Sequence, residues 1–248
     1  MPRRRPSWGS RPDPIRSHCI THLPRPHGHI PCCTRMRHWS DPDVMSLMSP
    51  DAPRAGFLEP PVPSRAAEEL QAEDLAELGY VANLSRVWSY DALALDELLG
   101  LSRRVARAAE LSIRHRLLLV LATSAARRST YCIYAWGSKF AAEIDARSAS
   151  AVVRGDDDPV GLTAAEVALV HWARSVATMP SSTTAADVDE LRETGWSDDQ
   201  IFAITVFSAL RMAFSTVNDA LGADPDPDLA GTTPLALQEV LSFGRHLG

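Results

Sequence analysis

From residue 64 onward, apolar side chains recur at the three- and four-residue spacing of α-helices. Ala and Leu dominate, runs of β-branched residues are scarce, and stretches rich in Gly, Pro and Asp separate the segments. The pattern predicts helices over residues 65–78, 82–108, 112–127, 130–145, 163–177, 184–194, 198–221 and 234–244. We therefore expect an all-α fold.

Two helix starts carry a specific signal. Thr163 with Glu166, and Ser197 with Gln200, have the spacing of a capping box, in which each side chain bonds the other residue's backbone N–H. The segments 117–126 and 200–210 carry no charge on any face, so we expect them to form the central helices of the bundle.

Composition divides the chain into two unlike parts. The whole chain has 248 residues, is 45% hydrophobic and has a net charge of −6. Residues 1–50 contain eight Arg and three Asp, a net +5, so the remainder carries −11. The same fifty residues hold nine of the 18 Pro and three of the four Cys. We expect a basic, disordered leader over 1–63 and a single helical domain over 64–248.

The leader allows sharper interpretations, which we consider less well supported. A zinc site at His27, His29, Cys32 and Cys33 would need two ligand pairs separated by a small folded unit, whereas these residues lie in one proline-broken run. The Arg cluster lacks the interleaved aromatics typical of a nucleic-acid site. We favour a third interpretation over these two: a translation start at Met45 or Met48, where the composition changes, which would remove the leader altogether.

No stretch reaches the roughly 18 uncharged apolar residues of a membrane span, and no secretory signal is evident. We therefore expect a cytoplasmic protein with no membrane or nucleic-acid partner. Neither a phosphate-binding loop nor a metal-binding motif is present, so we predict no cofactor and no metal.

Cys132 is the residue with the clearest chemical potential. It falls in the first turn of a predicted helix, where exposed N–H groups and cations such as Arg127 or Arg128 favour a thiolate. Ser129 is placed to cap that helix and donate a hydrogen bond to the sulfur. The structural alternative is a buried cysteine that acts only as a small apolar side chain.

The segment around Cys132 resembles the carboxymuconolactone decarboxylase and alkylhydroperoxidase D superfamily. The resemblance covers residues 65–230 and implies an alkylhydroperoxidase D-like helical bundle. It rests on three features: Leu111-Ser-x-Arg-x-Arg before a buried helix, Ser129-Thr-Tyr131-Cys132, and Asn218-Asp219-Ala220-Leu221-Gly222 before an Asp-Pro loop.

The redox motif of that superfamily is incomplete here. The attacking cysteine falls on Cys132 and its preceding tyrosine on Tyr131, but Ser129 replaces the resolving cysteine. Leu117 and Trp136 stand where the superfamily has its proton-relaying glutamate and histidine. An oxidised Cys132 would therefore need an external thiol to be reduced again.

Other side chains are candidates for the missing roles. His171 is a candidate acid or base, whereas His115 is expected to face solvent. Tyr131, Tyr134 and Trp136 surround Cys132 in sequence and could line a pocket for an apolar substrate, or belong to the core or a subunit interface. Asn218 and Asp219 are expected to make a polar bond within the bundle.

The resemblance implies a one-cysteine thiol peroxidase, in which Cys132 attacks a small peroxide or apolar substrate and an external thiol restores it. It also implies a homo-oligomer. Two alternatives stay open: a non-catalytic helical oligomer that binds an apolar ligand or partner, and a lactone decarboxylase, for which no acid–base pair is evident.

Overall fold

A computed structural model describes residues 56–140 and 143–247. By its internal contacts the chain divides into Met1–Ala52 and Pro53–Gly248, and every described residue belongs to the second unit. The predictions for the leader, including the zinc site and the later start, lie outside the described residues. Within the described part all regular structure is helical and there is no β-strand, so the all-α prediction is confirmed.

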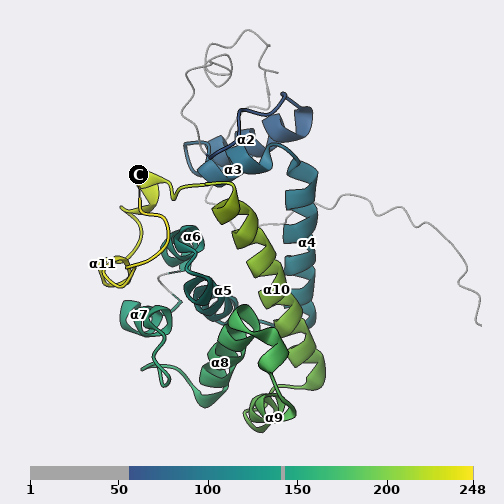
Figure 1. The fold of residues 1–248 in the computed structure, drawn as a ribbon, viewed down its shortest axis with the longest axis vertical. Coiled ribbons are helices and arrows are strands. Elements are labelled where there is room, and N and C mark those ends of the chain that lie inside the picture. The colour runs from purple at the N-terminus through teal and green to yellow at the C-terminus, as the bar shows by residue number, and fades with distance from the viewer. Residues whose placement is uncertain (1–55, 141–142, 248) are drawn as a thin grey trace, which may run out of the picture. The chain divides into compact units, whose positions relative to one another are not determined.

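The helices follow one another with short connections (Figure 1). They are α2 (Arg65–Glu77), α3 (Asn83–Trp88), α4 (Ala92–Ala108), α5 (Ile113–Arg127), α6 (Thr130–Phe140), α7 (Ala146–Arg154), α8 (Ala164–Thr178), α9 (Ala185–Glu193), α10 (Asp198–Ala220) and α11 (Leu235–Gln238). Single 3₁₀ turns lie at Pro180–Ser182 and Pro227–Leu229.

The centre of the bundle is α5. Every side chain from Leu117 to Ser124 is buried, because α6, α7, α8 and α10 pack around this helix. The long helix α10 lies against α4 on one side and against α5 and α8 on another (Figure 1). Both uncharged segments are therefore central, as predicted, although Phe202 of α10 is exposed.

Helix starts follow their capping signals closely. Both predicted capping boxes are present, at the first residues of α8 and α10. The predicted helix over 82–108 is divided into α3 and α4, because the Asp91 side chain accepts from the Ala94 N–H and begins a new helix.

Two further helices, α7 and α11, differ from the prediction. Helix α7 was not predicted, although Asp145 caps its start and Gly155 ends it in the left-handed conformation at φ 90°. Helix α11 covers only four residues of the predicted 234–244, and irregular backbone follows it.

A charged contact joins the starts of α5 and α8. Arg114 donates from Nε to Glu166 Oε1 at 2.5 Å and from Nη2 to Glu166 Oε2 at 3.3 Å. The same guanidinium donates to the carbonyls of Glu143 and Gly161, both at 3.0 Å. Arg114 therefore connects α5 and α8 to the segments on both sides of α7.

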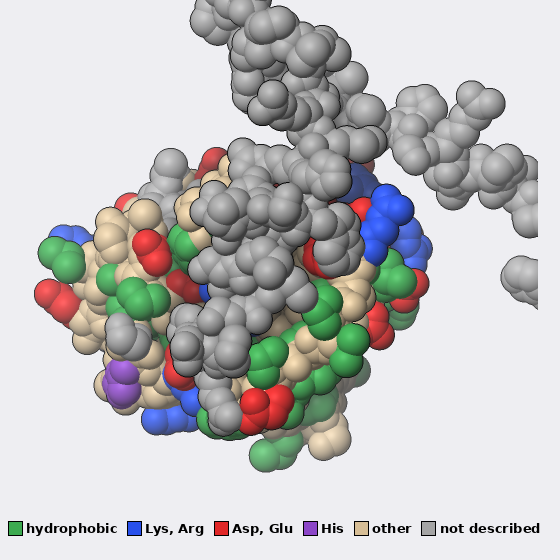
Figure 2. Space-filling view, turned by 90° about the horizontal axis from the view of Figure 1, so that it is seen from above, with side chains coloured by type: hydrophobic (Ala, Val, Ile, Leu, Met, Phe, Trp, Pro, Cys, Tyr) green, Lys and Arg blue, Asp and Glu red, His purple; other side chains and the backbone are tan. Residues whose placement is uncertain are grey.

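Helix α10 is long and apolar enough to cross a membrane by length and composition alone, although Arg211 interrupts its uncharged run. Part of it is buried by the bundle, so it serves here as a core helix. On the surface shown in Figure 2, the visible acidic and basic side chains are interspersed with neutral and apolar ones.

Candidate functional site

The turn between α5 and α6 places Cys132 at the buried N-terminal end of α6. Arg128 ends α5 in the left-handed conformation at φ 60°, and α6 begins two residues later at Thr130. Cys132 therefore lies in the first turn of α6, as predicted, and its exposed fraction is 1%.

The sulfur of Cys132 has two polar neighbours, and both come from α10. Ser215 Oγ lies 3.1 Å from Sγ, and Arg211 Nη2 donates to Sγ at 3.6 Å. Cys132 thus joins two helices separated by about eighty residues of sequence.

Arg211 is unusual because it is charged, buried and without a carboxylate. Its exposed fraction is 4%, and no described Asp or Glu lies within ion-pair distance of it. Aromatic rings cover the guanidinium, with Phe214 at 4.6 Å and Trp136 at 5.2 Å from centroid to Cζ. Its Nε atom is buried and has no hydrogen-bond partner in the described part of the chain. A buried charge is costly unless it is paired or hydrogen-bonded, and the Cys132 sulfur is the hydrogen-bond partner of this guanidinium among the described residues.

Arg211 belongs to a line of buried polar residues along α10, namely Ser208, Arg211, Ser215 and Asn218. Their spacing of three or four residues puts them on one face of the helix. At the end of this line Trp88 Nε1 donates to Asn218 Oδ1 at 2.8 Å, which confirms the expected bond within the bundle. We call these four α10 residues the polar stripe.

Sequence reasoning did not find Arg211. The available signal was its position as the one charge between Asp199 and Asp219 in an otherwise neutral helix. Arg127 and Arg128, the cations proposed instead, do not donate to the sulfur, and Arg128 packs over the Phe243 ring at 5.4 Å.

Ser129 does not act as predicted. Its hydroxyl is buried and is not bonded to Cys132. It lies beside the Asp219 carboxylate, where it opposes the rise in the pKa of Asp219 that burial causes. The reason is direction: the sulfur faces α10, where Ser215 takes the place expected for Ser129.

The three aromatic residues near Cys132 contact different partners. Tyr131 is buried and donates to the Asp226 carboxylate, away from the sulfur. Tyr134 is also buried, and its carbonyl accepts from Thr233 at 3.3 Å. Trp136 alone shares a partner with Cys132, because a residue four positions later lies on the same helix face and contacts Arg211. The printed contacts thus bring Trp136, but not the Tyr131 hydroxyl, to the group around Cys132, and a substrate-binding role for the three residues stays a prediction.

Neither histidine contacts the site. His171 Nε2 lies 2.7 Å from the Asp157 carbonyl, and Nδ1 lies 3.6 Å from Glu190. These contacts turn the ring away from the residues around Cys132. His115 packs edge-on against Trp196 at 5.1 Å instead of facing solvent, and burial lowers its pKa below the ordinary value.

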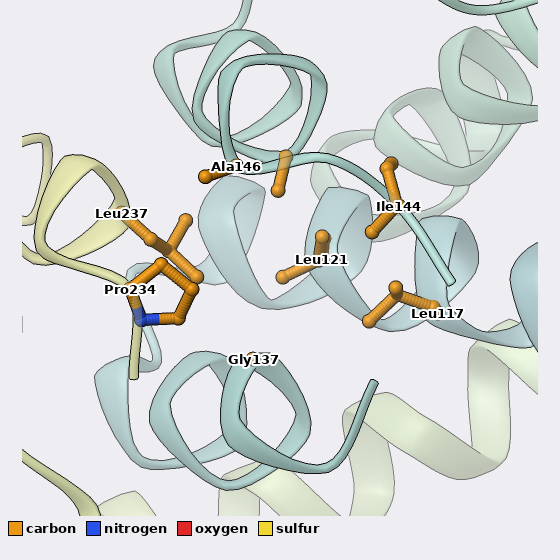
Figure 3. A pocket seen from close by; sticks show the side chains of 8 residues that line it. Leu117, Leu121, Gly137, Ile144, Ala146, Pro234 and Leu237 are labelled. Atoms are coloured by element: carbon orange, nitrogen blue, oxygen red, sulfur yellow. The ribbon is translucent and has the colours of Figure 1, made fainter. Parts of the chain in front are cut away.

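A small cavity lies on another side of α5. Leu117 and Leu121 project into it from α5, opposite Gly137, Ile144 and Leu237 (Figure 3). Its lining is apolar and its volume is about 10 Å³, roughly the space of one water molecule. It is too small for a substrate. No group of three metal-ligating side chains occurs among residues 56–140 and 143–247.

Comparison by sequence finds no relative: no protein-family model matches, and no curated protein matches. Solved structures do match. The "alkylhydroperoxidase AhpD core" peroxidase-related protein of Ralstonia eutropha JMP134 is 18% identical with a TM-score of 0.60, over 79% of this chain and 100% of that chain. The chain has the alkylhydroperoxidase D-like fold.

Two further solved structures are also similar to this chain in fold. A peroxidase-related protein from Silicibacter sp. TM1040 has a TM-score of 0.62 at 17% identity, over 73% of this chain and 97% of that one. The debrominase Bmp8 has a TM-score of 0.57 at 17% identity, over 73% of this chain and 96% of that one. A cysteine-to-alanine variant of that debrominase is similar too, in complex with 2,3,4-tribromopyrrole. The predicted fold class is confirmed, and at these identities the likeness concerns the fold.

Proposed function

We propose that this alkylhydroperoxidase-like protein is a one-cysteine thiol oxidoreductase that reduces small apolar hydroperoxides at Cys132. The observation that carries the proposal is the buried guanidinium of Arg211, which donates to the Cys132 sulfur and has no carboxylate partner among the described residues. A guanidinium in this position can stabilise negative charge that is shared between sulfur and substrate during the reaction, and the thiolate is the nucleophilic form of cysteine.

The first step transfers one oxygen atom. The Cys132 thiolate attacks the terminal oxygen of a hydroperoxide, and the S–O bond forms as the O–O bond breaks. The peroxide's hydrogen goes to the departing alkoxide, so the products are a Cys132 sulfenate and an alcohol. Arg211 stabilises the charge that is shared between sulfur and oxygen as this step proceeds.

The second step needs a co-reactant thiol. An external thiol attacks the sulfenate, releases its oxygen as hydroxide and forms a mixed disulfide with Cys132. A second thiol then releases Cys132 as the thiolate and leaves as the external disulfide. Cys132 is the free cysteine within the described ranges, so the reductant in this scheme comes from outside the domain.

Access to the sulfur shapes the expected kinetics. Because Cys132 is 1% exposed, a substrate reaches it only when the packing between α6 and α10 opens. We therefore expect small reagents such as methyl methanethiosulfonate to react much faster than bulky aromatic disulfides. The same burial favours the alternative function, a non-catalytic helical protein with a structural thiol.

The decisive experiment follows peroxide consumption with excess dithiothreitol. The background variant carries Cys19→Ser, Cys32→Ser and Cys33→Ser, so that the signal reports Cys132. We expect turnover of an alkyl hydroperoxide, none with Cys132→Ser added, and a loss of roughly 10²-fold with Arg211→Met. A halogenated pyrrole belongs in the substrate panel because of the debrominase likeness.

The outcome that removes the proposal is equally clear. If peroxide is not consumed, and Cys132 is labelled only after denaturation, the thiol is structural. The non-catalytic alternative then replaces the oxidoreductase.

A further inference from the structure

The Nε–Nη2 edge of the Arg211 guanidinium is only partly paired, and one of its two nitrogens contacts the Cys132 sulfur. The Cζ atom of Arg211 lies over the rings of Phe214 and Trp136, and a guanidinium donates hydrogen bonds only from the edges of its plane. In a guanidinium, the Nε–H and one Nη–H are parallel and share an edge that binds oxyanions with two bonds. Here Nη2 of that edge donates to Cys132 Sγ, whereas Nε is buried with no partner in the described structure.

The separation of 3.6 Å between Nη2 and Sγ is a hydrogen-bond distance for sulfur, whose atomic radius is larger than that of oxygen. An oxygen bonded to this sulfur therefore fits beside the line between Nη2 and Sγ, and not between the two atoms. From that position an oxygen can accept from Nη2, and the neighbouring Nε–H of the same edge is available as a second donor. Ser215 Oγ lies 3.1 Å from Sγ, so its hydroxyl is also within reach of an oxygen on this sulfur and can donate to it.

We propose that the Nε–Nη2 edge of Arg211 is a binding site for the oxyanion that oxidation creates on Cys132, so that Cys132 persists as a sulfenate. This inference rests on the proposed thiol chemistry of Cys132. It assigns Arg211 a role after the oxygen transfer as well as during it. Cys132 would then stay reversibly oxidised until an external thiol reduces it.

Persistence has a chemical reason. A free sulfenic acid condenses with a nearby thiol or is oxidised further to sulfinic acid. Cys132 has no described cysteine beside it, and burial limits access of a second peroxide. Two charge-assisted hydrogen bonds from Arg211 add a specific stabilisation of the sulfenate.

The first test measures the lifetime of the sulfenate. The Cys19→Ser, Cys32→Ser, Cys33→Ser protein is oxidised with a small excess of hydrogen peroxide, catalase removes the oxidant, and dimedone-labelled Cys132 is followed by mass spectrometry. We expect Arg211→Met to shorten the half-life by about tenfold or more, the factor that a single hydrogen bond to a charged group represents. Arg211→Lys keeps the charge but loses the pair of parallel N–H donors, so its sulfenate half-life is expected to lie between those of the unsubstituted and Arg211→Met proteins. Equal half-lives in all three proteins would overturn the inference.

The second test needs no peroxide chemistry. Cys132→Asp places a carboxylate oxygen where the sulfenate oxygen would lie, and Cys132→Asn is the matched neutral control. With Arg211 present, we expect the Asp variant to melt about 3 °C or more above the Asn variant; with Arg211→Met added, the order should reverse. An Asp variant that melts below the Asn variant, or does not fold while the Asn variant does, would refute the oxyanion site.

The two tests separate the possible failures. A wild-type Cys132 that resists peroxide defeats the proposed function, and the Asp–Asn comparison still decides whether the edge accepts an oxyanion. A reactive Cys132 whose sulfenate lifetime ignores Arg211 leaves the oxidoreductase in place and removes the inference.

Discussion

Removing the charge of Arg114 should destabilise the bundle in a pH-dependent way. The side chain of Arg114 is 29% exposed and that of its partner Glu166 is 7% exposed. Breaking a fully buried pair costs about 3–5 kcal/mol, whereas an exposed pair contributes up to about 1 kcal/mol. For this partly buried pair we expect Arg114→Met to cost about 2–3 kcal/mol. At 2–4 °C per kcal/mol for a chain of this size, the melting temperature should fall by roughly 5–10 °C.

The pH dependence follows from Glu166. Burial by itself raises the pKa of Glu166, but hydrogen bonds from Arg114 and from the Thr163 backbone outweigh it, so the pKa lies below the ordinary value. In the wild type this carboxylate contributes stability above its unfolded pKa, about 4.3, and loses it as the pH falls through the folded pKa. Without Arg114 the burial effect gains weight and the pKa rises. The stability deficit of Arg114→Met should therefore shrink as the pH falls from 7 toward 4.

Differential scanning calorimetry at several pH values checks this reasoning. The matched control is Arg114→Met with Glu166→Gln, which leaves no buried charge and keeps an amide oxygen for the Thr163 N–H. We expect this double variant to be more stable at pH 7 than Arg114→Met alone. An Arg114→Met protein that melts within 1 °C of the wild type, or a deficit that grows on acidification, would refute the argument.

Three further substitutions test other contacts. Tyr131→Phe removes the donor to the buried Asp226 carboxylate and should cost about 1.5–3 kcal/mol in urea unfolding. Because burial already raises the pKa of Asp226 and the Tyr131 bond opposes this, the loss should be larger at pH 7 than at pH 5. Trp88→Phe removes the 2.8 Å bond to Asn218 and should cost about 1–3 kcal/mol, with Asn218→Leu in the same protein recovering part of it. His171→Gln should leave the alkylation rate of Cys132 within about twofold of the wild-type rate, since the His171 ring contacts α9 and the loop before α8. A larger loss would show that His171 acts on Cys132.

The sequence was most informative where a structure depends on neighbouring residues. The capping boxes at Thr163 and Ser197 were predicted because both partners lie within one turn. Cys132 was placed in the first turn of its helix for the same reason, since Ser129 and Thr130 follow the end of a long apolar segment. The missed helix α7 carried a similar signal, Asp145 before it and Gly155 after it.

The chemistry around Cys132 could not be predicted in this way. Its partners, Arg211 and Ser215, come from a helix 79 and 83 residues away, and their identity depends on how α6 and α10 pack. The prediction relied on sequence neighbours and so named Ser129, which faces elsewhere. A single arginine in an apolar helix indicates a special role, but only the packing shows which group it meets.

The separation in sequence between Cys132 and the polar stripe also has a meaning during protein synthesis. Cys132 leaves the ribosome well before Arg211 is translated, so the nascent thiol exists for a time without its guanidinium. Its special environment arises only when α10 is complete and has docked against α6. The reactivity of this cysteine would thus report on whether the newly made chain has finished folding.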